Sequence, residues 1–221
     1  MFNTNNKTVT ALLLATLLTA CGSDDKKIPS DIPTIPEGYG DNNDPAVVAQ
    51  IKGTWSQDCT SVQGNIAKRQ QITFGDKSIT VVALEYGDSS CTTLHTRDTY
   101  IGQYQLNGPA TIGNDEVNTF EVIYTQSFSS VHTQKFADAR NKAKICDLTN
   151  WQPGVAVDVS DLSKCLPLFS LVQRKQLKFV RHETDRATQR PILFLDNPSK
   201  GFQPNGYPRE LDISFLTPGE L

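Results

Sequence analysis

Five cysteines are the residues of this 221-residue chain best suited to covalent chemistry: Cys21, Cys59, Cys91, Cys146 and Cys165. A cysteine can form a disulfide, bind a metal ion, act as a nucleophile or carry a lipid. Cys21 stands apart because it directly follows a short apolar segment near the N-terminus, whereas the other four are spread between residues 59 and 165. The two groups therefore need separate explanations.

The segment before Cys21 has the features of an export signal. Its apolar part runs from about Val9 to Ala20, and Lys7 is its only charged residue. A membrane-spanning helix needs about 20 apolar residues, so this shorter stretch is typical of the central region of a signal peptide. The alternative is a short buried helix that ends in a disulfide cysteine.

Leu18-Thr19-Ala20-Cys21 resembles the lipobox of bacterial lipoprotein signal peptides. The resemblance implies cleavage after Ala20 and attachment of diacylglycerol and a further acyl chain, such as palmitate, at Cys21. Several acyl chains on one residue anchor a protein stably in a membrane. Gly22 follows the cysteine, and that choice favours the outer membrane in enteric-type bacteria.

The other four cysteines indicate two disulfides, because an even number of cysteines in an exported chain is typical of a disulfide framework. Three pairings are possible, and we favour the sequential one, Cys59–Cys91 with Cys146–Cys165. Each bond would stabilise the fold by about 3 kcal/mol by restricting the unfolded chain. A metal site is the alternative, but the sequence has no CxxC pair and no histidine pair at ligand spacing. We therefore expect no metal and no cofactor.

The histidines lack the spacing of known catalytic motifs. His95, His132 and His182 are far apart and form no HExxH, and the sequence contains no G-x-S-x-G elbow, phosphate-binding glycine loop or dinucleotide fingerprint. We therefore expect a protein that is not an enzyme.

Other polar and aromatic residues have simpler explanations. Glu85, Glu121 and Asp185 could meet in a cavity as the carboxylates of glycosidases do, but their spacing does not require it. The run from Asp41 to Asp44 lacks the glycine and closing glutamate of a calcium loop. Trp151 could form a binding platform, although packing on its own disulfide is the favoured interpretation.

Alternating apolar and polar residues predict a mainly β domain. Residues 70–74 and 78–86 flank a Gly-Asp-Lys turn and predict a β-hairpin. Further strands are predicted over residues 91–106, 120–128, 168–180, 190–195 and 211–216, with a break at residues 107–109. The pattern favours an antiparallel β-barrel, which leaves no exposed edge strand, with a β-sandwich as the alternative.

One short helix is predicted over about Thr133–Lys144. Phe136, Ala139 and Ala143 fall on one face of this helix, which we expect to be the buried one.

Gly53-Thr54-Trp55 resembles the G-x-W motif that opens lipocalin-like barrels. Together with Cys59, Tyr86-x-Asp88-x-x-Cys91-Thr92, Cys146-Asp147-x-x-Asn150-Trp151 and Cys165, it also resembles a group of uncharacterised bacterial lipoproteins, over about residues 51–195. The resemblance implies a lipocalin-like barrel whose end is closed by Trp55. It also implies a basic residue from a late strand over that ring, for which Arg174 and Arg181 are the candidates.

Composition divides the chain into three parts. Residues 1–20 are the expected signal peptide, and residues 21–50 are the expected lipidated cysteine and flexible tether, rich in Pro, Gly, Asp and Asn. Residues 51–221 are long enough for a single β-rich domain. Without Lys7 the chain has 21 − 1 = 20 basic residues against 24 acidic ones, which argues against nucleic acid as a partner.

These features predict a lipid-anchored protein of the bacterial cell envelope, in the outer membrane. We expect a non-catalytic module that binds a small apolar molecule or docks on an envelope protein. The alternative is a structural or surface protein-interaction lipoprotein, which an exposed apolar patch would indicate. An envelope hydrolase ranks third, because it requires a histidine beside a nucleophile or carboxylate in a cleft.

Overall fold

The computed structural model describes residues 34–62, 64–160, 165, 176–196, 203–204 and 206–219. The expected signal peptide, Cys21 and the first part of the expected tether lie outside these residues. The elements are α1 (Pro45–Ile51), β1 (Gly53–Gln57), β2 (Thr60–Ser61), β3 (Ala67–Phe74), β4 (Ser78–Tyr86), β5 (Leu94–Ile112), β6 (Asp115–Val131), α2 (Gln134–Ala143), the 3-10 helix η1 (Ile145–Asp147), β7 (Ala156–Asp158), β8 (Gln176–Thr184), β9 (Pro191–Asp196) and β10 (Leu211–Pro218). Neither of the described α-helices has the length and apolar composition that crossing a membrane requires.

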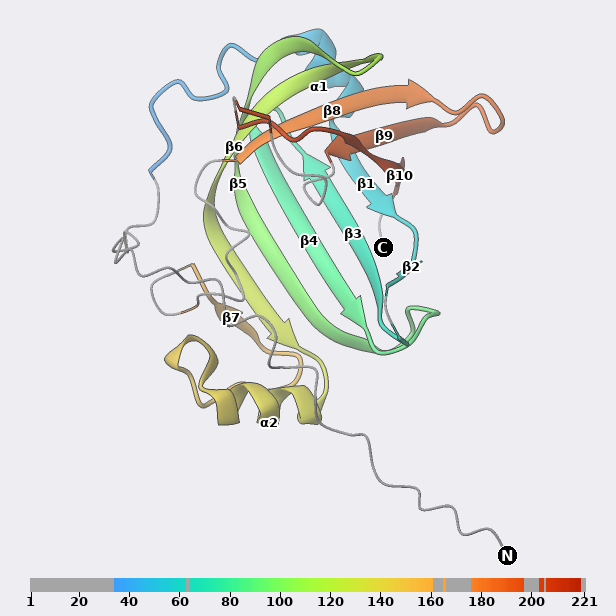
Figure 1. The fold of residues 1–221 in the computed structure, drawn as a ribbon. Coiled ribbons are helices and arrows are strands. Elements are labelled where there is room, and N and C mark those ends of the chain that lie inside the picture. The colour runs from blue at the N-terminus through green and yellow to red at the C-terminus, as the bar shows by residue number, and fades with distance from the viewer. Residues whose placement is uncertain are drawn as a thin grey trace, which may run out of the picture.

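Eight antiparallel strands form a closed barrel in the order β1-β10-β9-β8-β6-β5-β4-β3 (Figure 1). The barrel closes because β1 pairs with β10 on one side and with β3 on the other. The short strands β2 and β7 are additions that pair with β3 and β6. The predicted mainly β, antiparallel barrel is therefore confirmed, and its shape is consistent with a lipocalin-like barrel.

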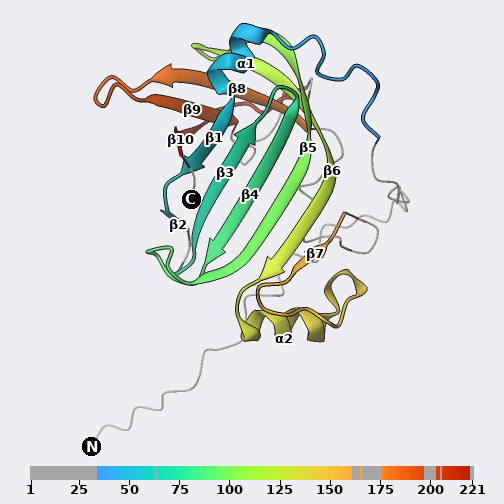
Figure 2. The same ribbon diagram turned by 180° about the vertical axis from the view of Figure 1, so that it is seen from behind.

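The barrel wall is uneven in height. Strands β3 to β6 run along its full length, whereas β8, β9 and β10 cross only one part of it (Figures 1 and 2). On one edge of β6, β8 pairs with Asn118–Val122 and β7 pairs with Phe128–Ser130. Within the described part of the chain, no strand pairs with this edge between Ile123 and Gln126, so the wall is interrupted there.

One end of the barrel is filled by aromatic side chains. The Trp55 ring is 4% exposed, and its indole N–H donates to the Ile51 carbonyl of α1 at 2.6 Å. Phe74 contacts Tyr104 and Phe120 edge to face, with ring centroids 5.4 and 6.1 Å apart. Such packing buries large apolar areas and excludes water, so this end has a solid core.

Among the described residues, a histidine contacts the Trp55 ring. The His182 ring of β8 lies 5.8 Å from it, centroid to centroid, in an edge-on contact. Arg181 lies over the Phe194 ring instead, because successive side chains of a strand point to opposite faces of the sheet. Arg174, the other candidate, lies outside the described residues.

The segment before β1 packs on the barrel, which differs from the tether expected as far as residue 50. The Tyr39 hydroxyl donates to the Glu121 carbonyl at 3.0 Å, and the Asn43 side chain accepts from the Leu106 backbone N–H at 2.7 Å. The Asp44 carboxylate caps α1, a helix that the sequence analysis did not predict. The Asn and Asp residues of this segment form turns and a helix cap. The composition of the segment alone did not distinguish such a structure from a flexible linker.

Most predicted elements are present, with two differences, and residues 168–175 of the strand predicted over 168–180 lie outside the described residues. The hairpin is β3–β4, and β5 continues through the predicted break at residues 107–109 because a register shift between Leu106 and Gly108 absorbs the extra residue. The predicted helix is α2, capped by Thr133, but Ala137 is its buried residue, whereas Ala139 and Ala143 are exposed. Of the expected buried face, Phe136 does pack against the core, whereas the expectation is wrong for Ala139 and Ala143, because Arg140 faces the barrel interior alongside Ala137.

At Gly102 the backbone of β5 lies close to that of β6, and this contact generates a first prediction. A β-carbon at Gly102 would lie 2.2 Å from the Ile123 carbonyl oxygen, which is fixed backbone. We expect Gly102→Ala to lower the free energy of unfolding in urea by about 1–3 kcal/mol, as overpacking does.

Gly75→Ala is the matched control. Its β-carbon would meet the Ser78 hydroxyl, which can rotate away, so we expect a change below about 0.5 kcal/mol. Equal losses in the two variants would contradict the close approach of β5 and β6.

Candidate ligand-binding site

Beyond the aromatic end, the inner face of β5 and β6 is polar. Asp98 pairs with Ser129, Tyr100 with Ser127, and Gly102 with Tyr124. These pairs share a face with the core pairs at the aromatic end, since side chains alternate along each strand and the shift at Gly102 preserves the inward set. Asp98, Tyr100, Tyr124, Ser127 and Ser129 are called the polar inner wall below.

A charged pair joins the polar inner wall to α2. The Ser129 hydroxyl donates to the Asp98 carboxylate and accepts from Nη1 of Arg140 at 2.8 Å. The Arg140 guanidinium also lies over the Trp151 ring, 4.5 Å from its centroid. Burial raises the pKa of Asp98 and lowers that of Arg140, while their mutual attraction opposes both shifts. These contacts hold α2 against the end of the barrel.

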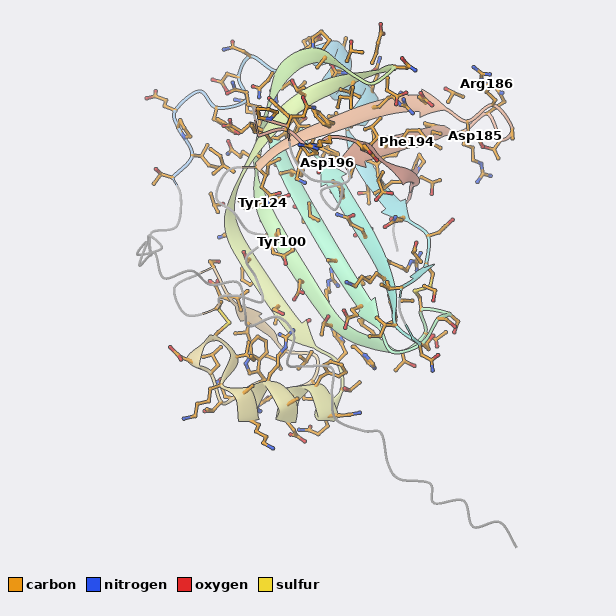
Figure 3. The ribbon with its side chains drawn as sticks, in the orientation of Figure 1. Tyr100, Tyr124, Asp185, Arg186, Phe194 and Asp196 are labelled. Atoms are coloured by element: carbon orange, nitrogen blue, oxygen red, sulfur yellow. A yellow bond between two sulfur atoms is a disulfide. The ribbon has the colours of Figure 1, made fainter. Side chains whose placement is uncertain are left out.

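Two tyrosines occupy the middle of the polar inner wall (Figure 3). The rings of Tyr100 and Tyr124 have centroids 6.0 Å apart and are inclined at 59°. Burial is the main cause that raises the pKa of both hydroxyls. A nearby negative charge raises it further, that of Asp98 for Tyr100 and that of Asp196 for Tyr124. Both therefore stay protonated at neutral pH and can donate and accept hydrogen bonds. Neither hydroxyl has a hydrogen-bond partner among the described residues.

Asp196 approaches Tyr124 from the end of β9 (Figure 3). Asp196 is only 7% exposed, and its Oδ2 lies 3.4 Å from Nζ of Lys178 on β8. Its Oδ1 is buried and has no hydrogen-bond partner in the described part of the chain. The hydroxyl of Ser127, a residue that is 1% exposed, is likewise buried and has no hydrogen-bond partner among the described residues. A buried polar group without a partner costs about 1–3 kcal/mol, so native proteins rarely keep one without a reason.

The residues singled out from the sequence lie elsewhere. Both expected disulfides are present: Cys59–Cys91 ties the end of β1 to the β4–β5 loop, with Cα atoms 6.0 Å apart, and Cys146–Cys165 spans 4.1 Å. Gly53 and Trp55 belong to the aromatic end.

Trp151 packs in the core. It is buried in the same cluster as Cys146 and Cys165, and its indole N–H donates to the Ile145 carbonyl at 3.2 Å. The interpretation of Trp151 as packed on its disulfide therefore fits the structure better than a binding platform.

The histidines contact other parts of the fold. His95 packs on Phe136 with ring centroids 4.4 Å apart, whereas Nε2 of His132 lies 3.1 Å from the Ser130 hydroxyl. Ser130 is a buried residue on β6, and the pair lies outside the described groove, so the pair does not present an accessible nucleophile in a cleft. Burial and the charge of Arg97 lower the pKa of His132.

The carboxylates considered for a shared cavity do not meet. Glu85 pairs with Lys68 at 4.0 Å, Glu121 accepts from Tyr39, and Asp185 accepts from residues of its own turn. Among the described residues, no three His, Cys, Asp or Glu side chains are grouped to hold a metal ion.

A groove of about 630 Å³ lies on the outer side of the barrel, between the β5–β6 turn, β8, β9 and residues 209–212. Arg181 lines it, pairs with the Asp115 carboxylate and lies 3.1 Å from that of Glu183. The Arg181 guanidinium also covers the Phe194 ring, at 4.7 Å from its centroid. The charge of Arg181 is thus already compensated by Asp115 and Glu183, and the face of the Phe194 ring is covered by Arg181. The polar inner wall is therefore the stronger candidate for a ligand-binding site.

No protein-family model matches the chain, and no curated protein matches it. The site is therefore interpreted from its own geometry.

The sequence analysis did not single out the polar inner wall, although a signal was present. Asp98 and Tyr100 precede Tyr104 at the same period-two positions, so an inward-facing Tyr104 predicts that both also face inward. Lys178 and Asp196 carried no such signal, because only the pairing of β8 and β9 joins them, and Asp196 in turn acts on Tyr124.

Two serines on β6 provide a matched test of the polar inner wall. The Ser129 hydroxyl bonds to Asp98 and Arg140, whereas the Ser127 hydroxyl has no hydrogen-bond partner among the described residues. We expect Ser129→Ala to lower the free energy of unfolding by about 1–3 kcal/mol, because it leaves Asp98 and Arg140 short of a partner. We expect Ser127→Ala to leave stability unchanged or raise it by about 1 kcal/mol. Urea unfolding measures both, and a loss for Ser127→Ala as large as for Ser129→Ala would show that the Ser127 hydroxyl is structurally paired.

Proposed function

We propose that this protein is a lipid-anchored binding protein of the bacterial cell envelope, and that its polar inner wall binds a small polar molecule. The observation that carries the proposal is a set of polar groups without partners, of which the Ser127 hydroxyl and Oδ1 of Asp196 are buried. Ser127 and Asp196 have unpaired oxygen atoms, and the Tyr100 and Tyr124 hydroxyls beside them also have no partner among the described residues. A protein that keeps several such groups in one place pays in stability, and binding sites are where that is typical.

The filled aromatic end supports a polar ligand over the apolar one expected from the sequence. Trp55, Phe74, Tyr104 and Phe120 are all nearly fully buried against one another. An apolar ligand needs apolar surface of its own, and these side chains already cover each other. The unpaired groups of the polar inner wall are hydroxyls and a carboxylate, which suit a polar ligand.

Anchoring is supported by the N-terminal sequence. The lipobox-like Leu18–Cys21 run implies lipid at Cys21, and Thr34 is the first described residue. Thr34 is 34 − 21 = 13 positions after Cys21, so the chain between them can span at most about 47 Å, which keeps the barrel close to the membrane. We propose the outer membrane as its location, on the basis of Gly22.

The protein-interaction alternative has weaker support. The exposed large apolar side chains of the described residues are Val62, Ile66 and Val155. Val62 and Ile66 belong to the β2–β3 turn, whereas Val155 precedes β7, so they are divided between two segments. Scattered apolar residues of this kind are normal on protein surfaces.

The ligand proposal predicts a small molecule that co-purifies with the protein. The full chain is isolated from an exporting bacterium in mild detergent, and its mass is measured under native and denaturing conditions. We expect a native mass excess that disappears on denaturation and is lost in the double variant Tyr124→Phe, Ser127→Ala. A wild-type chain without added mass, also after incubation with a small-molecule extract of the same cells, would contradict the proposal.

The anchoring proposal predicts that Cys21 carries lipid. We expect radiolabelled palmitate to enter the wild-type chain and not the Cys21→Ser variant, because the thiol is the attachment point. The Cys59→Ser variant is the control for a general effect of removing a cysteine and should keep the label. Labelling that persists in Cys21→Ser would rule out this attachment site.

A further inference from the structure

The charges around the polar inner wall balance, which restricts the ligand that can bind there. Glu85, whose charge acts on both Asp98 and Arg140, is itself paired with Lys68 at 4.0 Å and adds no net charge. Asp98 is paired through Ser129 with Arg140, and Asp196 lies beside Lys178. These two negative and two positive groups sum to zero. A ligand with a net charge would leave that charge uncompensated in a largely desolvated place, which is costly. A neutral ligand avoids this cost.

The unpaired groups restrict the hydrogen bonds that the ligand must make. Oδ1 of Asp196 only accepts, so the ligand must supply at least one donor there. The hydroxyls of Ser127, Tyr100 and Tyr124 can each donate and accept. Ligand hydroxyl groups match such a set best, because each one also donates and accepts.

The two tyrosine rings add an apolar component. Tyr100 and Tyr124 are inclined to each other at 59°, so their faces point in different directions along the wall. A ring face packs well against C–H groups, and binding sites commonly combine such surface with a few placed polar groups. A molecule that carries both C–H faces and several hydroxyls fits this combination.

We infer that the ligand of the polar inner wall is a neutral polyhydroxylated molecule, that is, a neutral saccharide. This inference rests on the proposed function and specifies the ligand class for the same site. The Asp196 carboxylate and the hydroxyls of Tyr124 and Ser127 hold the sugar hydroxyls, while the tyrosine rings pack on its C–H groups.

The test uses the full chain in detergent and an array of neutral mono-, di- and trisaccharides built from common hexoses and N-acetylhexosamines. Galacturonate and glucosamine are the anionic and cationic comparators. We expect saturable binding of at least one neutral sugar, confirmed by calorimetry, and at least tenfold weaker binding of both charged sugars. Asp196→Asn should lower the affinity for the neutral sugar about tenfold or more, and Tyr124→Phe should lower it about two- to tenfold.

Tyr207→Phe is the matched control, because the Tyr207 hydroxyl accepts from the Asn107 side chain at 3.0 Å and its ring stacks on Phe179, in a different cluster. It should leave the affinity unchanged. Sugar binding that Asp196→Asn and Tyr124→Phe do not weaken would overturn the inference.

Two further outcomes separate this inference from the proposed function. If the co-purified molecule contains no sugar and no array member binds, the saccharide inference fails while the binding function stands. If nothing co-purifies and no array member binds, both fail.

Discussion

Closure of the sheet is the constraint on which the rest of the structure depends. Because β1 pairs with both β3 and β10, each of the eight barrel strands has two neighbours and the fold has a separate interior. Alternation then places every second side chain of β5 inside, apolar and polar alike. Tyr104 meets other aromatic rings there, whereas Asp98 and Tyr100 are carried into the same interior further along the strand. The polar inner wall is thus a direct consequence of closure.

The two parts of the interior have different roles. The aromatic end and both disulfides provide stability, since packed rings and crosslinks favour the folded chain. The polar inner wall costs stability wherever its groups lack partners. Arg140 limits this cost at one end by its contacts with Ser129 and Trp151. What remains unpaired lies around Tyr124, beside the stretch of β6 that no described strand covers on one edge.

Local patterns predicted much of this fold, and long-range pairings account for what they missed. The β3–β4 hairpin and α2 follow from neighbouring residues, and the disulfides follow from an even number of cysteines. The packing of Tyr39 depends on a partner 82 residues away, and no local pattern reports that. Likewise His182 contacts Trp55 only because β8 lies across the barrel from β1. Asp98 and Tyr100 could have been found from their alternation with Tyr104, whereas Lys178 and Asp196 join the site only through the pairing of β8 and β9.

The central claim is that the polar inner wall is a binding surface, and the side-chain resonances of its tyrosines test this most directly. The full chain, labelled with ¹³C at the tyrosine ring, is titrated with the polar small-molecule fraction of the exporting cells. We predict that the resonances of Tyr100 and Tyr124 shift together along one saturation curve, while Tyr207 stays in place. Shifts confined to Tyr207 or Tyr86, or no shift at saturation, would contradict the account.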